Sequence, residues 1–366
     1  MSGTTALRRS PSPREGRRTG AARLATILSA AWLCFAAPAL AAPQDSAVPK
    51  GWTDYKARFV AADGRVVDDA NGNVSHSEGQ GYAMLLAVAA DDGVAFARLW
   101  GWTSRELYRR PDGLASWRWM PDAVPHVTDA NNATDGDLLI AWALLRAARR
   151  WNSPDYRDVS RRIALAVGRS ATFTSRFGLA LKPGASGFDA AAMADGPVVN
   201  LSYWVFPALD ALPEVAPEVD WAGLTRTGLA LLEASRFGPG DLPTDWVSLK
   251  GAPAPAKGFP REFGYNAVRV PLYLAWGGVG TPGLYAPFLR LARDGAAPTT
   301  VDVATGLPRE PLREAGYRAV FTLAACAAGG EGAPAAPASG PGDHYYPSSL
   351  RLLAALAAAD RDLRCD

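Results

Sequence analysis

Apolar residues recur at helical spacing along most of this chain. In residues 138–148 they occupy one face, at Leu138, Ala141, Leu144, Leu145 and Ala148. This pattern predicts an amphipathic helix with one buried side. Similar patterns predict helices near Trp52 and at about 80–91, 94–109, 134–151, 155–169, 198–212, 219–237, 264–277, 281–293, 310–327 and 344–360.

Strand patterns are scarce by comparison. The run Thr-Thr-Val-Asp-Val at 299–303 predicts at most one short strand. Helices in pairs, joined by long polar loops, favour an all-α toroid of helical hairpins with at most a few short strands. No repeat of about 34 or 40 residues is visible, which argues against a regular repeat solenoid. Residues 250–260 and 328–342 are rich in Pro, Gly and Ala and predict surface loops, so we expect residues 42–366 to form a single domain.

The first 41 residues have the pattern of an export signal. Six arginines precede an apolar run from Leu24 to Leu40, and Ala39-Leu40-Ala41 resembles a cleavage site between small residues. Pro38 interrupts the run, which is short for a membrane span. We therefore expect a periplasmic or secreted protein with no membrane insertion after residues 1–41 are removed.

Charge and histidine content exclude several function classes. The whole chain carries 38 basic and 36 acidic residues; without the leader, which holds six Arg and one Glu, 32 and 35 remain, a net charge of −3. No basic patch predicts binding to nucleic acid or anionic lipid. The histidines, His76, His126 and His344, are scattered, so the sequence predicts neither a metal site nor a cofactor.

Two cysteines remain once Cys34 leaves with the leader. Export would permit a disulfide between Cys326 and Cys365. Cys326 also lies within the apolar run 323–327, where it could simply be a small buried residue. The sequence leaves both interpretations open.

Two acidic motifs each open a predicted helix. Asp135 and Asp137 precede the apolar run of residues 133–151, and Glu78 lies in Ser77–Met84. Such residues could simply cap a helix, where free N–H groups favour a side-chain oxygen or a negative charge. Two carboxylates at helix starts are also what acid–base chemistry on a neutral substrate requires.

These two motifs resemble those of glycoside hydrolase family 8. Residues 133–151 are similar to the signature Ala-(Ser/Thr)-Asp-Gly-Asp, followed by Ile-Ala and a helix ending in an aromatic residue, and Ser77–Met84 resembles the general-acid motif. The similarity covers roughly residues 51–360 and is greatest to endoglucanases that accompany bacterial cellulose synthesis. It implies an (α/α)6 barrel with its cleft where the inner helices begin.

The resemblance also implies an activity. We expect an inverting endo-β-1,4-glucanase, a monomer acting on cellulose-type β-1,4-linked glucan, possible partners being the proteins of a cellulose synthase and export complex. A chitosanase or xylanase of the same family, and a weakly active or inactive glycan-binding protein, remain alternatives.

The resemblance assigns roles to single residues. Glu78 would be the general acid, with Gly79 and Gly81 letting the backbone approach a sugar. Asp135 would contact the sugar at the cleavage site and help hold the catalytic water, while Asp137 supports the helix start. Tyr203, in Asn200-Leu201-Ser202-Tyr203-Trp204, resembles a tyrosine that positions the same water.

One position departs from the family pattern. Family members of the cellulose-synthesis type carry Tyr-Asp-Ala-x-Arg-Val, whose Asp is the general base, but residues 265–270 read Tyr-Asn-Ala-Val-Arg-Val. The neutral amide of Asn266 has no useful basicity. The base could be Asp135 or Glu262, or Asn266 could orient a water that Asp135 activates; these interpretations are favoured over feeble hydrolysis. Arg269 is expected to stay in the cleft, bound to a carboxylate or a sugar.

Aromatic and polar residues near the motifs are candidate sugar contacts. Trp117 and Trp119 would share one face if their stretch is extended, as a stacking platform requires, or would pack under a loop. Asp129 and Asn131 could bind sugar hydroxyls or shape a turn, and Tyr265 is a further candidate. We expect four tryptophans on helix faces to belong to the core instead: Trp102, Trp142, Trp151 and Trp276.

Overall fold

The computed structural model describes residues 47–292, 297–329 and 342–365, which belong to one compact unit, Asp45–Asp366. The export signal predicted at 1–41 lies outside the described residues. Within them, no helix combines the length and the apolar character that a membrane crossing needs.

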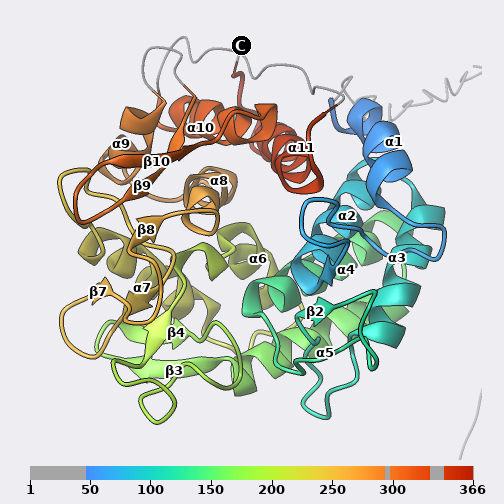
Figure 1. Cartoon of the computed structure of the whole chain (residues 1–366). Coiled ribbons are helices and arrows are strands. Elements are labelled where there is room, and N and C mark those ends of the chain that lie inside the picture. Colours follow the sequence, from blue (N-terminus) through green and yellow to red (C-terminus); the bar gives the residue numbers. More distant parts are fainter. Residues whose placement is uncertain (1–46, 293–296, 330–341, 366) are drawn as a thin grey trace, which may run out of the picture. The chain divides into compact units, whose positions relative to one another are not determined.

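Helices make up about half of the described unit (Figure 1). The α-helices are α1 (Ala47–Phe59), α2 (Ser77–Ala89), α3 (Gly93–Glu106), α4 (Thr134–Trp151), α5 (Pro154–Ser170), α6 (Phe206–Ala211), α7 (Trp221–Ala234), α8 (Val270–Gly277), α9 (Pro282–Leu291), α10 (Ala315–Ala327) and α11 (Tyr345–Asp360), with short 3-10 turns η1 (Leu201–Tyr203), η2 (Leu212–Glu214) and η3 (Ala267–Arg269).

The helices close a ring. Helices α2, α4, α6, α8 and α11 contact one another in that order, and α11 contacts α2 again. Figure 1 shows them around the centre, with α1, α3, α5, α7 and α9 on the outside. The predicted all-α toroid of helical hairpins is therefore confirmed.

Short antiparallel strands lie in the segments between the helices. The strand expected at 299–303 is β9 (Thr299–Asp302). The pairs and sheets are β1 (Ser75–His76) with β2 (Arg118–Trp119), β3 (Thr172–Ser175) with β4 (Gly178–Leu181), β5 (Val198–Val199) with β6 (Val247–Ser248) and β7 (Ala254–Pro255), and β8 (Glu262–Phe263) with β9 and β10 (Pro308–Pro311).

Three predicted helices were too long. The stretch 198–212 contains β5, η1 and a helix α6 that begins only at Phe206, with Pro207 in its first turn. In the same way α8 begins at Val270 beside Pro271, and α10 begins after the Pro-flanked strand β10. Proline lacks a backbone N–H and fits the first helical turn but not the interior, so it sets the starts of α6 and α8, whereas strand β10 takes up the residues before α10.

Glycines let α2 and α4 approach closely at their starts. A Cβ on Gly136 would lie 2.1 Å from Ser77 Oγ and 2.8 Å from the backbone N of Glu78, and one on Gly81 would lie 2.6 Å from Leu139 Cβ. A Cβ on Gly79 would meet Tyr345 Oη at 2.4 Å. The structure thus gives Gly79 and Gly81 a packing role, and the close approach of a sugar to them stays a prediction. They make room for neighbouring helices, and this packing brings Glu78 close to the start of α4.

The tryptophans assigned to the core are mostly there. Trp102, Trp142 and Trp276 are 2%, 5% and 2% exposed, which confirms the prediction for them. Trp151 is only half-buried, and its ring packs against Phe96.

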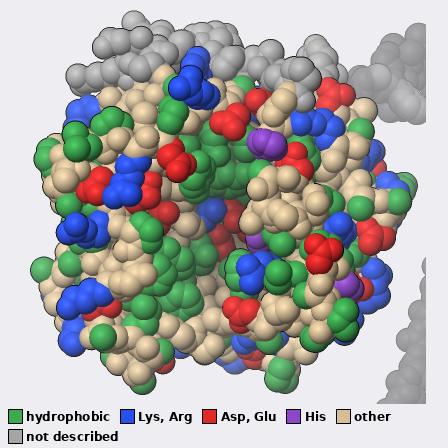
Figure 2. Space-filling view, viewed as in Figure 1, with side chains coloured by type: hydrophobic (Ala, Val, Ile, Leu, Met, Phe, Trp, Pro, Cys, Tyr) green, Lys and Arg blue, Asp and Glu red, His purple; other side chains and the backbone are tan. Residues whose placement is uncertain are grey.

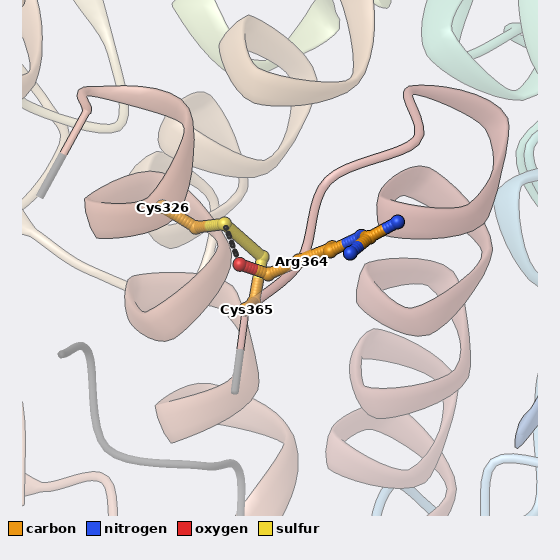
Figure 3. The surroundings of a disulfide bond; sticks show 3 residues. All are labelled: Cys326, Arg364 and Cys365. Atoms are coloured by element: carbon orange, nitrogen blue, oxygen red, sulfur yellow. Dashed lines mark hydrogen bonds between the residues drawn. A yellow bond between two sulfur atoms is a disulfide. The ribbon is translucent and has the colours of Figure 1, made fainter. Parts of the chain in front are cut away.

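A disulfide joins α10 to the chain beyond α11. Cys326 lies in the last turn of α10 and Cys365 follows α11, with the two Cα atoms 5.5 Å apart (Figure 3). Cys326 Sγ also lies 3.3 Å from the Arg364 carbonyl oxygen. Of the two interpretations that the sequence left open, the structure supports the bond.

Candidate active site

The beginnings of the ring helices meet at one place. Glu78 lies in the first turn of α2 and Asp135 in the first turn of α4, while Arg269 ends η3 just before α8. Figure 2 shows a hollow near the middle of this face, in which acidic and basic side chains lie between hydrophobic surfaces.

Arg269 is the centre of the hydrogen-bond network. Its side chain is buried, and Nη1 donates to Glu78 Oε1 at 2.6 Å, while Nη2 lies 3.3 Å from Asp135 Oδ2. Nη2 also donates to Ser202 Oγ at 2.8 Å and to Asn266 Oδ1 at 3.2 Å. One guanidinium thus holds both candidate carboxylates, because its donors form a rigid, permanently charged fork. The expectation that Arg269 binds a carboxylate is met twice over.

The environment of Asp135 favours its protonated form. The side chain is 1% exposed, and burial, followed by the charge of Glu78, raises the pKa of Asp135 to about 8, although Arg269 opposes the shift. Its Oδ1 accepts the Gly136 N–H at 2.8 Å. The protonation of Asp135 therefore depends on the charges of its two neighbours, Glu78 and Arg269.

Neither Asp135 nor Asp137 is the N-cap residue of α4, so the simpler interpretation of these two residues as helix caps is wrong. The N-cap residue is Ala133, without a side-chain hydrogen bond, and Thr134 Oγ1 donates to the Lys182 carbonyl at 2.7 Å. Asp135 lies inside the first turn, where its Oδ1 accepts the Gly136 N–H while its Oδ2 faces Arg269.

Glu78 is held by a tyrosine as well as by Arg269. Tyr82, one turn further along α2, donates its hydroxyl to Glu78 Oε1, and the Tyr82 and Tyr273 hydroxyls are 3.0 Å apart. Arg269 and Tyr82 both donate to Oε1 of Glu78. Within the described residues Oε2 accepts no hydrogen bond, which leaves one oxygen of the carboxyl group for a substrate.

Asp137 serves a different part of the fold. It accepts hydrogen bonds from the Ala115 N–H at 2.8 Å, from Asn132 Nδ2 at 2.9 Å and from the Tyr108 hydroxyl at 3.4 Å. Burial raises the pKa of Asp137 to about 7 despite these bonds. The residue fixes the loop before α4 to the helix and makes no contact with Arg269.

Tyr203 lies beside the network. The Arg269 Cζ atom is 5.9 Å from the centre of its ring. Burial, and next the charge of Asp135, raise the pKa of Tyr203 well above its ordinary value, so the hydroxyl stays neutral and can donate or accept a hydrogen bond.

Asn266 contacts an acid that sequence reasoning missed. Its Nδ2 lies 3.3 Å from Asp245 Oδ2, and Asp245 also accepts the backbone N–H groups of Gly264 at 2.9 Å and Ala267 at 2.8 Å. Asp245 lies in a loop, without a helix start or a motif beside it. Nothing in the sequence separated it from other loop acids.

Trp117 and Trp119 do not form a shared platform. Trp117 stacks on His76 at 5.9 Å, whereas Trp119 stacks on His126 at 4.2 Å and meets the edge of Trp102. The Arg65 guanidinium lies 4.8 Å from the Trp119 ring. Trp119 thus packs against loop and helix side chains, the alternative that the spacing allowed, although both tryptophans are half-buried and sugar contact stays a prediction for each.

Asp129 and Asn131 have loop roles. Asp129 Oδ1 accepts the Asn131 N–H at 2.9 Å, and its Oδ2 accepts Trp117 Nε1 at 2.8 Å. Asn131 Nδ2 donates to the Ser186 carbonyl at 2.9 Å. The structure therefore shows the turn role for both. A role in sugar binding stays a prediction.

Glu262 and Tyr265 lie at the edge of the site. Glu262 is in β8, paired with Asp302 of β9, and no described contact joins it to Glu78, Asp135 or Arg269. Tyr265 is 46% exposed, and its hydroxyl donates to Glu310 Oε2 at 2.9 Å. Tyr265 can thus offer its ring to a ligand, whereas Glu262 is displaced from the network. Across the described ranges, no group of His, Cys, Asp or Glu could hold a metal ion.

Comparison with known proteins identifies the family. A model of glycosyl hydrolases family 8 matches residues 24–360. The chain belongs to this family. A probable endoglucanase of Novacetimonas hansenii is 37% identical to this family 8 chain over 332 residues, which are 89% of this chain and 95% of that protein.

Solved family 8 structures agree with the fold. An endo-β-1,4-glucanase from Acetobacter xylinum is 37% identical and superposes with a TM-score of 0.80 over 87% of this chain and 99% of that one. A family 8 endoglucanase from Klebsiella pneumoniae is also 37% identical, with a TM-score of 0.77 over 85% and 99% of the two chains. These likenesses confirm the expected (α/α)6 barrel.

Proposed function

We propose that this family 8 glycoside hydrolase is an endo-β-1,4-glucanase that cuts cellulose-type chains with inversion. Relatives named as endoglucanases, 37% identical to nearly the whole chain, support the substrate class. The observation that carries the mechanism is the placement of Glu78 and Asp135 on one guanidinium, at the hollow where the ring helices begin.

In the proposed reaction, Glu78 gives its proton to the oxygen that bridges two sugars, and the bond between this oxygen and the anomeric carbon breaks. A water attacks the same carbon from the opposite face and loses its proton to Asp135. Glu78 thus ends ionised and Asp135 protonated, and a proton exchange with solvent resets the pair.

The charges of the two carboxyl groups depend on each other. The charge of an ionised Glu78 is one of the causes that raise the pKa of Asp135. When Glu78 carries the catalytic proton, that contribution disappears, and Asp135 ionises more readily beside Arg269. Protonation of the acid therefore favours ionisation of the base.

Asn266 and Tyr203 would orient the attacking water. Asn266 is half-buried, and its Oδ1 has a second lone pair besides the one facing Arg269. Glu262, the alternative base, has no described contact with the network, so we assign the base role to Asp135.

The decisive experiment measures new reducing ends from carboxymethylcellulose. The wild type should release them, and Glu78→Gln should abolish release while the protein still melts cooperatively. Glu233→Gln is the matched control, since this exposed carboxylate on α7 pairs with Arg236 just beyond the helix, and no described contact joins it to the Arg269 network. A wild type that binds the polymer without cutting it would support the glycan-binding alternative, and an active Glu78→Gln variant would remove the acid assignment.

The cellular setting is a further proposal. The predicted signal at 1–41 supports a periplasmic or secreted location, and the resemblance to endoglucanases of cellulose synthesis supports action on nascent glucan, as a monomer near the synthase and export complex. Fractionation of cells that express the full chain, with mass spectrometry of the exported N-terminus, tests the location. Retention of residues 1–41 in the cytoplasm would contradict it.

A further inference from the structure

Asn266 stands between a carboxylate and a guanidinium. Its Nδ2 lies 3.3 Å from Asp245 Oδ2, and its Oδ1 accepts Arg269 Nη2 at 3.2 Å. An ionised carboxylate only accepts hydrogen bonds, and a guanidinium only donates them. An amide is therefore the side chain of this size that satisfies both neighbours at once.

These neighbours also fix which way the amide points. If the amide were turned around, Nδ2 would face the donors of Arg269 and Oδ1 would face the oxygens of Asp245. Both contacts would then be repulsive, and the amide group of half-buried Asn266 would lose its partner at each end. Only one orientation remains, with Oδ1 toward the catalytic network.

Asp245 is itself held in place by the same loop. Its Oδ1 accepts the Gly264 and Ala267 N–H groups, and its Oδ2 accepts the Asn266 N–H at 3.4 Å as well as the side-chain amide. The Asp245 carboxylate thus accepts backbone N–H groups that come before and after Asn266 in the chain. Within the described residues it has no contact with Glu78, Asp135 or Arg269, so it acts through Asn266.

We infer that Asp245 is a positioning residue for the reaction: it locks the amide of Asn266 so that Oδ1 faces Arg269 and the water that attacks the sugar. The inference rests on the proposed glucanase function. It explains why an amide works at position 266, because a second carboxylate there would face Asp245 at about the same distance and one of the two would have to keep a proton.

The first test is Asp245→Asn. The Gly264 and Ala267 N–H groups should donate to the side-chain oxygen of the new amide. Its NH2 group would then face Asn266 Nδ2 and force the Asn266 side-chain amide to turn around. We expect kcat on cellohexaose to fall on the order of 100-fold, as a misplaced reacting group does. KM, and cellohexaose affinity measured by calorimetry, should stay within about twofold, because uniform binding is untouched.

The second test exchanges the two side chains. In Asp245→Asn/Asn266→Asp the amide at 245 donates to the carboxylate at 266, which still accepts from Arg269. This double variant should recover kcat to within about tenfold of the wild type, a recovery measured against both single variants. Asn266→Asp alone should shift the rising limb of the pH–rate profile to higher pH, since its two adjacent carboxylates resist ionisation together.

A loop-anchoring control separates positioning from folding. Asp302, at the end of β9, also accepts two backbone N–H groups, those of Ala304 and Thr305, besides its ion pair with Arg309, and Asp302→Asn should leave kcat unchanged. Wild-type kcat in Asp245→Asn would overturn the inference, and so would a double variant as slow as Asp245→Asn itself. Either result leaves the glucanase function intact, because the wild type and Glu78→Gln measured alongside decide that separately.

Discussion

Asp135 and Asp137 lie two residues apart in the first turn of α4, and they anchor two different regions of the molecule. Both are fully buried, and burial raises the pKa of each, to about 8 and about 7. Asp135 faces the hollow and shares a guanidinium with another carboxylate. Asp137 faces the loop before the helix and is satisfied by a backbone N–H, an amide and a hydroxyl.

The difference shows that a raised pKa alone does not identify a catalytic acid or base. Neutral donors surround Asp137 and leave it little to offer a substrate. Asp135 instead keeps a long contact, 3.3 Å, to a charged group that it shares with Glu78. A carboxylate whose protonation depends on a second carboxylate can change its charge during a reaction, whereas a saturated one holds a loop in place.

The largest effect expected separates the two residues by activity. Asp135→Asn should lower kcat on cello-oligosaccharides by about 10²–10⁴-fold, the range lost with a positioned general base. Asp137→Asn, with the same chemical change two residues away, should keep kcat within about tenfold, any loss coming from the loop. Steady-state rates with melting curves measure both, and similar losses in the two variants would contradict the separation.

Stability against pH should also distinguish them. A carboxyl group with a raised pKa in the folded state binds more protons there than in the unfolded chain, so its contribution falls as pH rises from the unfolded pKa to the folded one. For Asp137, with values of 3.8 and about 7, the fall between pH 5 and 7 is about 2–3 kcal/mol.

Urea unfolding at several pH values measures this slope. Asp137→Asn should flatten the curve up to about pH 7, while the wild type keeps a further fall up to about pH 8 that Asp135→Asn lacks. A wild type whose stability rises over this range would contradict both pKa shifts.

The smallest effect concerns single hydroxyls in the two regions. Ser202 accepts from Arg269 Nη2 and donates to Asn200 Oδ1 at 2.8 Å, so Ser202→Ala removes a support of the guanidinium and should lower kcat by about fivefold, near 1 kcal/mol. Tyr108→Phe removes the 3.4 Å contact to Asp137 and should change stability by at most about 1 kcal/mol with no change in kcat. A slower Tyr108→Phe enzyme would mean that the two regions are coupled.

Sequence reasoning reached the parts of this molecule that have a local pattern. Helix spacing and the two acidic motifs were enough to place Glu78 and Asp135 at helix starts, and the departure at Asn266 was visible in the same motif. The starts of α6 and α8 were placed too early because a proline lies in the first turn of each, and the start of α10 because residues 308–311 form a strand.

Contacts made by the tertiary fold were beyond such reasoning. Asp245 lies in a loop, 21 positions before the Asn266 that it contacts, and no periodicity connects them. The packing of Trp119 against His126 and Trp102 also depends on how loops fold over α3, and spacing in one strand does not contain that information.

The most direct test of the acid–base account varies the leaving group. An aryl β-glucoside oligomer with a dinitrophenol leaving group needs no proton for bond cleavage, whereas a cello-oligosaccharide does. Rates of Glu78→Gln on both substrates, relative to the wild type, form the measurement. The account predicts near-normal cleavage of the aryl substrate and almost none of the oligosaccharide. Equal loss on the two would show that Glu78 does not deliver the proton.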